Sequence, residues 1–257
     1  MTADLRFSKL FQLHQHSGRP IVVWAFIPYV QTEPGLVSEC YDNPLTRREL
    51  AEVFSALGIE WHWTAVTPQN LRETVETVLA QSHGRTPIVL NYCDGDEIFG
   101  EPGIAVIRHL EEKGIAFTGA GAAFYHISTS KIRMKTAFLQ AGVPTAPYAL
   151  ISDLERDTPG LCARLGAPLF IKPVVSGGSF GISLQSGVHN DAELQTQLRQ
   201  LLQGEFGREF AAGGLFVERF INGPEFTVLV LGHFDQPETR RLYPPVERAF
   251  NPGLPEE

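Results

Sequence analysis

Residues 20–118 alternate between the patterns of buried strands and amphipathic helices, and this alternation restricts the possible folds more than any other feature of the sequence. The apolar run IVVWAFI at residues 21–27 is typical of a strand buried on both faces. Helix patterns follow, with Val53 and Leu79 among the positions expected to be buried, and the second helix is expected to begin near Thr67 and Pro68. Further strand patterns separate these helices at residues 59–64, 87–92 and 115–117. The sum predicts a parallel sheet covered by helices, with ligands beyond the carboxyl ends of its strands.

Acidic residues gather after the third of these strands, where Asp94, Asp96 and Glu97 precede Glu101. Such carboxylates could hold a metal ion or a substrate amine at the strand end. They could equally form a solvated loop that leads into a helix, since acidic residues favour helix N-termini. The sequence leaves both interpretations open.

The pattern changes at the small-residue stretch GAGAA of residues 119–123, which predicts a boundary between a domain at residues 1–122 and a second at 123–257. A helix expected from about residue 128 to Gly142 is followed by short strands and helices. Two late strands at residues 215–221 and 225–231 are joined by the turn sequence Asn222-Gly223-Pro224. The second domain is therefore expected to be α+β, with antiparallel hairpins.

The segment PLFIKPVVSGGSFGI at residues 168–182 has the layout of a phosphate-binding strand and loop. Lys172 ends a short apolar strand, and the small-residue loop contains Gly177, Gly178 and Ser179, which supply close backbone N–H groups and a hydroxyl. The alternative is an ordinary hairpin. Upstream, Lys131 and Lys135 stand four residues apart and share one face of a helix, which is either a solvated face or a second source of charge for the same anion.

Composition excludes several classes of partner. The formal net charge is −8 and no basic run is present, which disfavours nucleic acid and anionic membranes as partners. The three cysteines are far apart and lack C-x-x-C spacing, so we expect ordinary thiols, as in proteins of the reducing cytoplasm. The first twenty residues contain no apolar signal core, and the run before Pro28 is too short to span a bilayer. A cytoplasmic protein is expected.

The ordered series of motifs resembles the ATP-grasp superfamily and, within it, the D-alanine–D-alanine ligases. The motifs that show the resemblance are Lys131 and Lys135 on one helix, FIKP at residues 170–173, the glycine–serine loop, VERFI at 217–221 and GPEFT at 223–227. In the first domain, Asp94-Gly95, GEPG at 100–103 and FTGAG at 117–121 fall in the family's order. The resemblance implies a Rossmann-like pre-ATP-grasp α/β domain, followed by the first part of an ATP-grasp domain that is incomplete at its C-terminal end.

The resemblance also assigns roles to single residues. Lys131 and Lys172 match the lysines that contact the nucleotide phosphates, and Lys172 and Ser179 match catalytic positions. Gly177, Gly178 and Ser179 match the loop that closes over ATP. The strand that lines the family's adenine pocket is matched by Glu218, Arg219, Phe220 and Ile221, and the carboxylate that holds the ribose is matched by Glu225. Glu101 and Asp94 fall near contacts to the amino-acid substrate.

The implied activity is ATP-dependent C–N bond formation between a carboxylate and an amine, with ATP and Mg²⁺, small amino acids as substrates, and a homodimer allowed. The chain departs from the family at Ser130, where aspartate is usual, and at Asp94, where many members have histidine. It ends before the family's magnesium carboxylates, so no metal ligand is expected within residues 1–257. The alternative function is a nucleotide-binding regulatory or scaffold protein without ligase activity.

Overall fold

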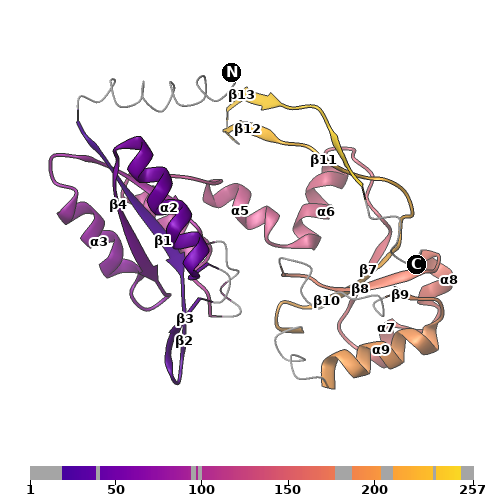
Figure 1. Ribbon diagram of the computed structural model, residues 1–257. Helices are drawn as coiled ribbons and strands as arrows, with labels where there is room; N and C mark the ends of the chain where they lie inside the picture. Colours follow the sequence, from indigo (N-terminus) through magenta and orange to yellow (C-terminus); the bar gives the residue numbers. More distant parts are fainter. Residues whose placement is uncertain are drawn as a thin grey trace. The chain divides into compact units, whose positions relative to one another are not determined.

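The computed structural model describes residues 19–38, 41–93, 97, 100–176, 187–203, 211–233 and 236–249 (Figure 1). Its contacts divide the chain into two compact units, Met1–Ala122 and Ala123–Glu257, which we name the N-terminal unit and the C-terminal unit. Within the described ranges, no helix combines the length and the apolar character that a membrane crossing needs.

The N-terminal unit is built on a parallel sheet with the described strand order β4-β1-β5-β6. Its strands are β1 (Ile21–Pro28), β4 (Glu60–Val66), β5 (Thr86–Asn91) and β6 (Ala116–Phe117). The helices α2 (Pro44–Leu57), α3 (Leu71–Gln81) and α4 (Ile104–Glu112) alternate with them, and β2 (Val30–Thr32) and β3 (Gly35–Val37) form a small hairpin after β1. The predicted parallel α/β arrangement is therefore confirmed.

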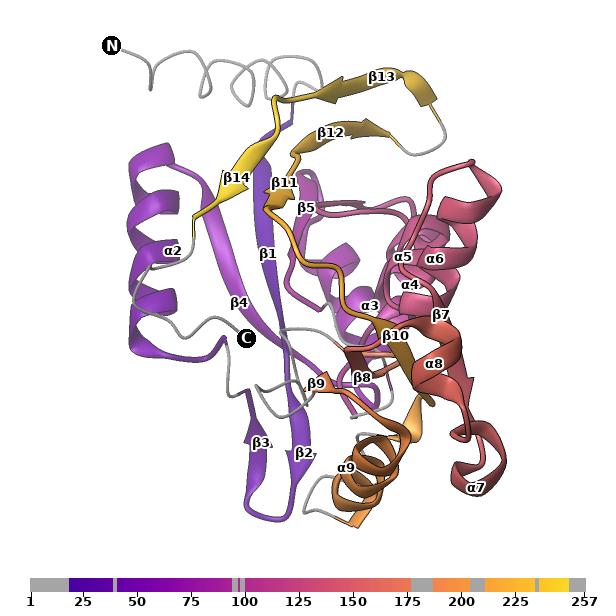
Figure 2. The ribbon, with the colours of Figure 1, turned by 90° about the vertical axis from the view of Figure 1, so that its right-hand side faces the viewer.

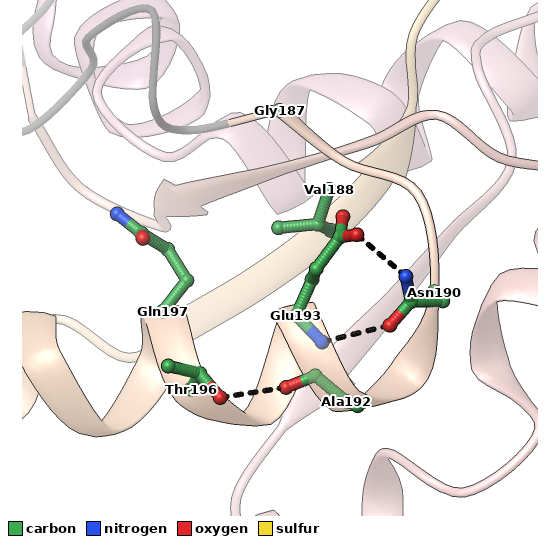
Figure 3. Close-up of a pocket in the computed structure, with 7 residues that line it drawn as sticks. All are labelled: Gly187, Val188, Asn190, Ala192, Glu193, Thr196 and Gln197. Carbon is green, nitrogen blue, oxygen red and sulfur yellow. Dashed lines mark hydrogen bonds between the residues drawn. The ribbon is translucent and has the colours of Figure 1, made fainter.

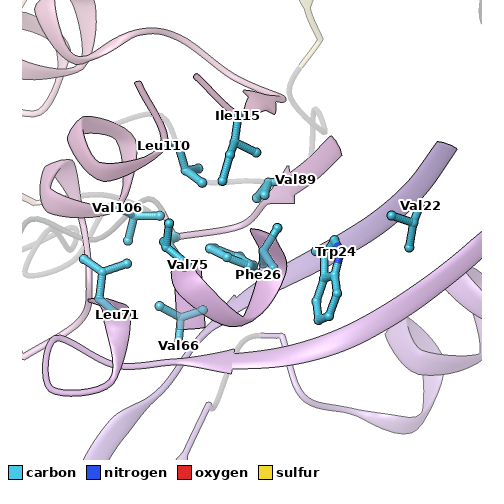
Figure 4. Close-up of a cluster of buried hydrophobic side chains, with 12 residues drawn as sticks. Val22, Trp24, Phe26, Val66, Leu71, Val75, Val89, Val106, Leu110 and Ile115 are labelled. Atoms are coloured by element: carbon cyan, nitrogen blue, oxygen red, sulfur yellow. The ribbon is translucent and has the colours of Figure 1, made fainter. Parts of the chain in front are cut away.

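Strand β1 places alternate side chains in two hydrophobic layers, because successive residues of a strand face opposite sides of the sheet. Val22, Trp24 and Phe26 contact apolar residues of α3 and α4 (Figure 4). Ala25 and Ile27 face the other side, where Leu50 of α2 packs. Figure 2 shows α2 and α3 on opposite faces of the sheet. Both faces of β1 are covered, as its unbroken apolar sequence predicts.

Two details of the helix predictions are wrong. Val53 is 49% exposed and Leu79 is 37% exposed, since each lies at the margin of its helix's apolar stripe, beside the buried Phe54 and Val78. Helix α3 also begins at Leu71 and not at Thr67. The backbone N–H of Thr67 donates to Asn70 Oδ1 at 2.8 Å, and that of Asn70 donates to Thr67 Oγ1 at 3.1 Å, so a closed turn precedes the helix.

The C-terminal unit contains an antiparallel sheet with the described order β7-β10-β8-β9, as expected for this region. Its strands are β7 (Tyr148–Ile151), β8 (Leu169–Pro173), β9 (Gly187–Val188) and β10 (Leu215–Arg219). The helices of this part of the chain are α5 (Ala122–Ser128), α6 (Lys131–Gln140), α7 (Leu154–Asp157), α8 (Leu161–Leu165) and α9 (Asp191–Gln203). One sheet face packs a core with Leu161 of α8 and with Leu194 and Leu198 of α9.

The helix expected from about residue 128 to Gly142 is α6, which begins slightly later, at Lys131, and a separate helix, α5, precedes it. Ser130 has an extended backbone and its Oγ accepts a hydrogen bond from the Arg133 N–H, which caps α6 and starts it at Lys131. The residue that departs from the family pattern therefore acts as a helix cap.

The last described strands pair differently from the expected hairpin. Among the described strands, β10 pairs with β7 and β8, whereas β11 (Glu225–Thr227) pairs with β14 (Val246–Arg248). The stretch 225–231 is broken into β11 and β12 (Val230–His233), and β12 pairs with β13 (Gln236–Leu242). The strand after residues 222–224, β11, therefore pairs with β14 and not with β10, the strand before them.

Candidate functional site

The pairing of β8 with β10 sets Lys172 and Glu218 on the same face of the C-terminal sheet. Lys172 lies opposite Phe216 in the antiparallel register, and Glu218 lies opposite Phe170. The residues between them, Ile171 and Val217, point into the core on the other face. Lys172 and Glu218 are therefore diagonal neighbours across two strands, within reach of long side chains.

Glu218 bridges two lysines. Its Oε1 accepts a hydrogen bond from Lys172 Nζ at 2.5 Å, and its Oε2 lies 2.6 Å from Lys135 Nζ. Burial raises the pKa of the Glu218 carboxyl, but the hydrogen bonds from Lys135 and Lys172 outweigh this and hold the pKa below its ordinary value. The carboxylate is thus ionised at neutral pH, between two ammonium groups.

Lys135 is buried, which the sequence did not predict. Its side chain is only 9% exposed, and its Nζ donates to Thr145 Oγ1 at 2.8 Å and to the Ala146 carbonyl at 3.2 Å. The ammonium group also lies 5.1 Å from the centre of the Tyr148 ring, in cation–π geometry. The only signal in the sequence was the four-residue spacing from Lys131, which also fits a solvated helix face.

Lys131 contacts the chain that leads into the glycine–serine loop. Its backbone N–H donates to the Val174 carbonyl at 2.9 Å, and its Nζ donates to the Ser176 carbonyl at 3.0 Å and to Ser176 Oγ at 2.8 Å. Lys172 stands four residues before Ser176 on the same segment. The structure therefore places Lys131 against the segment that leads from Lys172 into the loop. Gly177, Gly178 and Ser179 lie outside the described residues.

The strand predicted to line the adenine pocket leaves the sheet at Arg219. The backbone N–H of Phe220 donates to the Pro168 carbonyl at 2.9 Å, and its ring stacks on Phe170 with 5.0 Å between centroids. Arg219 is exposed, and Ile221 is 61% exposed. Glu225 faces Arg248 across the β11–β14 pair, with 3.5 Å between Glu225 Oε2 and Arg248 Nη1.

Comparison with known proteins points to one family. Residues 138–248 match the family model described as "D-ala D-ala ligase C-terminus". A D-alanine–D-alanine ligase of Neisseria meningitidis is 34% identical over 133 residues, which are 52% of this chain and 40% of that ligase. The chain therefore spans less than half of the length of this relative. A D-alanine–D-alanine ligase from Bacillus anthracis, solved in complex with ATP, has a TM-score of 0.59 at 18% identity, over 92% of this chain and 68% of that one.

The C-terminal unit is therefore similar to D-alanine–D-alanine ligases, and the chain shares the fold of the solved ligase. The same fold is found in enzymes of another kind. The biotin carboxylase domain of a 2-oxoglutarate carboxylase from Hydrogenobacter thermophilus, solved with Mg-ADP and bicarbonate, has a TM-score of 0.55 at 22% identity, over 82% of this chain and 47% of that one.

Of the acidic residues of the N-terminal unit, Glu97 is the one for which a described contact decides between the two interpretations left open by the sequence. Glu97 Oε1 accepts a hydrogen bond from the Ala105 N–H at 2.7 Å, which serves the first turn of α4, so for Glu97 the helix-start interpretation holds. Glu101 is half-buried just before α4. Asp94 and Asp96 lie outside the described residues. In the part of the chain that the structure describes, no three His, Cys, Asp or Glu side chains are grouped to hold a metal ion.

A shallow hollow lies at the N-terminal half of α9 and is lined by Gly187, Val188, Asn190, Ala192, Glu193, Thr196 and Gln197 (Figure 3). It shares no residue with the predicted nucleotide site. Its polar groups belong to the helix start, where the Glu193 N–H donates to Asn190 Oδ1 at 2.9 Å and the His189 N–H donates to Glu193 Oε2 at 2.8 Å. These bonds form a capping box at the start of α9, and the hollow offers few groups beyond it.

Proposed function

We propose that this chain is an ATP-dependent carboxylate–amine ligase that binds its nucleotide on the C-terminal unit. The observation that carries the proposal is the contact of Lys131 with the segment that leads from Lys172 into the glycine–serine loop, where Lys131 Nζ donates to Ser176. Two ammonium groups beside a loop of small residues suit a polyphosphate, because they neutralise its charge while backbone donors approach it closely. The similarity to D-alanine–D-alanine ligases over residues 138–248 supports the same assignment.

The proposed reaction has two steps. A carboxylate oxygen of the first substrate attacks the γ-phosphorus of ATP, which forms an acyl phosphate and releases ADP. The amine of the second substrate then attacks the acyl carbon, loses a proton, and displaces inorganic phosphate to leave an amide. Phosphoryl transfer depends mainly on positioning and on charge neutralisation, which Lys172, Lys131 and the Ser179 region would supply.

The remaining assignments extend this proposal. Arg219, Phe220 and Ile221 would border the adenine, and Glu225 would accept hydrogen bonds from the ribose after releasing Arg248, with which it pairs at 3.5 Å. Glu101 and Asp94 would contact the amino-acid substrate. Mg²⁺ would enter as the Mg–ATP complex and neutralise the phosphate oxygens that the lysines leave free. The cytoplasmic location, the small amino-acid substrates and a homodimer stay proposals of the same kind.

The test is release of ADP from Mg-ATP in the presence of a panel of D- and L-amino acids. The proposal predicts release that requires an amino acid and falls at least about a hundredfold in Lys172→Ala, since one preorganised charge at a transferring phosphoryl group contributes on this scale. Lys113→Ala is the matched control, because Lys113 pairs with Glu76 on the surface of the other unit. Saturable ATP binding without turnover on any amino acid would contradict the ligase activity and favour the nucleotide-binding regulatory or scaffold protein.

A further inference from the structure

The cluster of Lys135, Glu218 and Lys172 carries a charge imbalance that the proposed function does not explain. One carboxylate lies between two ammonium groups, at 2.6 Å from Lys135 Nζ and 2.5 Å from Lys172 Nζ. The cluster therefore has a net charge of about +1 when all three groups are ionised. A pair made of Glu218 and Lys172 alone would be neutral.

The two lysines differ in what they can contact. Lys135 has a side chain 9% exposed, and its three ammonium donors are matched by three acceptors: Glu218, Thr145 and the Ala146 carbonyl. Lys172 is 27% exposed and, in the part of the chain that the structure describes, donates one hydrogen bond, to Glu218. Only Lys172 is therefore open to a ligand, and Lys135 acts through Glu218.

We propose that Lys135 is a positioning residue for phosphate binding: it offsets the charge of Glu218, so that Lys172 presents a net positive charge to the polyphosphate of ATP. Without Lys135, an incoming phosphate would meet a closed Glu218–Lys172 ion pair, in which the carboxylate offsets much of the attraction of the ammonium. With Lys135 in place, the carboxylate fixes the Lys172 side chain and its charge is already balanced from the buried side. This inference rests on the proposed function, because it assumes that the anion at Lys172 is a nucleotide polyphosphate.

The experiment measures binding of three probes by calorimetry: ATP, inorganic tripolyphosphate and adenosine. Lys135→Met should weaken ATP and tripolyphosphate about tenfold and leave adenosine unchanged, because a unit charge a few ångströms away in a partly solvated site has an effect of this order. Lys135→Arg should keep most of the affinity. Lys113→Met, in the other unit, is the control for a lysine-to-methionine change on the surface.

The decisive variant is the double substitution Lys135→Met with Glu218→Gln, which removes one charge of each sign and returns the net charge to that of Lys172 alone. Its affinity for tripolyphosphate should recover to within about threefold of the unmodified chain, since the charge facing the phosphate is restored. Tripolyphosphate is the appropriate probe because it has no base that could contact Glu218.

Two results would overturn the inference. The first is unchanged tripolyphosphate affinity in Lys135→Met, and the second is a double variant as weak as the single one, which would mean that Lys135 only supports the fold. If Lys135→Met does not fold, as judged by a thermal melt, the double variant still decides, because it buries no unpaired charge and must match the unmodified chain. Absence of saturable ATP binding by the unmodified chain, despite tripolyphosphate binding that follows the predicted pattern, would instead refute the proposed function.

Discussion

Replacing Glu218 by glutamine should destabilise the C-terminal unit, because two ammonium groups lose the carboxylate that they share. A hydrogen bond to a charged group contributes about 1.5–3 kcal/mol to stability, so two such bonds set an upper limit of about 3–6 kcal/mol. Lys135 keeps its bonds to Thr145 and Ala146, and Lys172, which is 27% exposed, can regain water. The amide oxygen also remains as one acceptor. We therefore expect a loss of about 2–3 kcal/mol at pH 7.

The loss should depend on pH with a definite sign. The pKa of Glu218 in the folded protein lies below its ordinary value, because the hydrogen bonds from Lys135 and Lys172 outweigh the effect of burial. A carboxyl group of this kind stabilises the folded state above its unfolded pKa of about 4.3, and the contribution disappears as the pH falls through the folded pKa. The difference between the unmodified chain and Glu218→Gln should therefore be full at neutral pH and shrink below about pH 4.

The assay is urea unfolding followed by far-ultraviolet circular dichroism, with tryptophan fluorescence as a second signal. All three tryptophans, Trp24, Trp61 and Trp63, lie in the N-terminal unit, so their fluorescence reports on that unit directly. A loss of about 2–3 kcal/mol corresponds to a fall of about 1–2 M in the urea midpoint of the circular dichroism transition. An unchanged midpoint at pH 7, or a difference that persists undiminished at pH 3, would refute the reasoning.

Two further predictions concern the core of the C-terminal unit. Leu198→Ala should lower the free energy of unfolding by about 2–4 kcal/mol, because Leu198 is 0% exposed. Leu202→Ala, at a residue 36% exposed on the same helix, should lower it by less than about 1 kcal/mol. Equal urea midpoints for the two variants would contradict the observed packing of α9. The Cys162 thiol is buried, and its pKa is raised to about 11 by desolvation and by its hydrogen bond to Asp191. In a Cys40→Ser, Cys93→Ser background, iodoacetamide at about pH 8 should therefore alkylate Cys162 slowly in the folded chain and rapidly in urea. Fast alkylation of the folded chain would contradict the buried environment of this thiol.

Sequence periodicity predicted the sheets well because each strand carries its own burial pattern. The unbroken apolar run of β1 and the alternation in β8 state directly which side chains are buried. The alternation also separates Lys172 from Ile171, so the face of Lys172 was predictable. Its partner was not, since Glu218 stands 46 residues away and becomes a neighbour only through the register of β8 against β10.

The burial of Lys135 could not be predicted from its helix alone. A spacing of four residues places Lys131 and Lys135 on one face, but the pattern does not say what that face meets. In the fold, Lys131 contacts Ser176 while Lys135 contacts Glu218 and the ring of Tyr148. The partner of β11 could not be predicted either, because β14, with which it pairs, lies about twenty residues further along the chain.

The measurement that tests the central claim most directly is calorimetric titration of ATP into the unmodified chain and into a Lys131→Ala, Lys172→Ala double variant. The account predicts one saturable site in the unmodified chain and a loss of at least about a hundredfold in affinity in the double variant, since two of the charges facing the phosphates are removed. ATP affinity that is equal in both proteins, with both folded by circular dichroism, would contradict a phosphate site at these lysines.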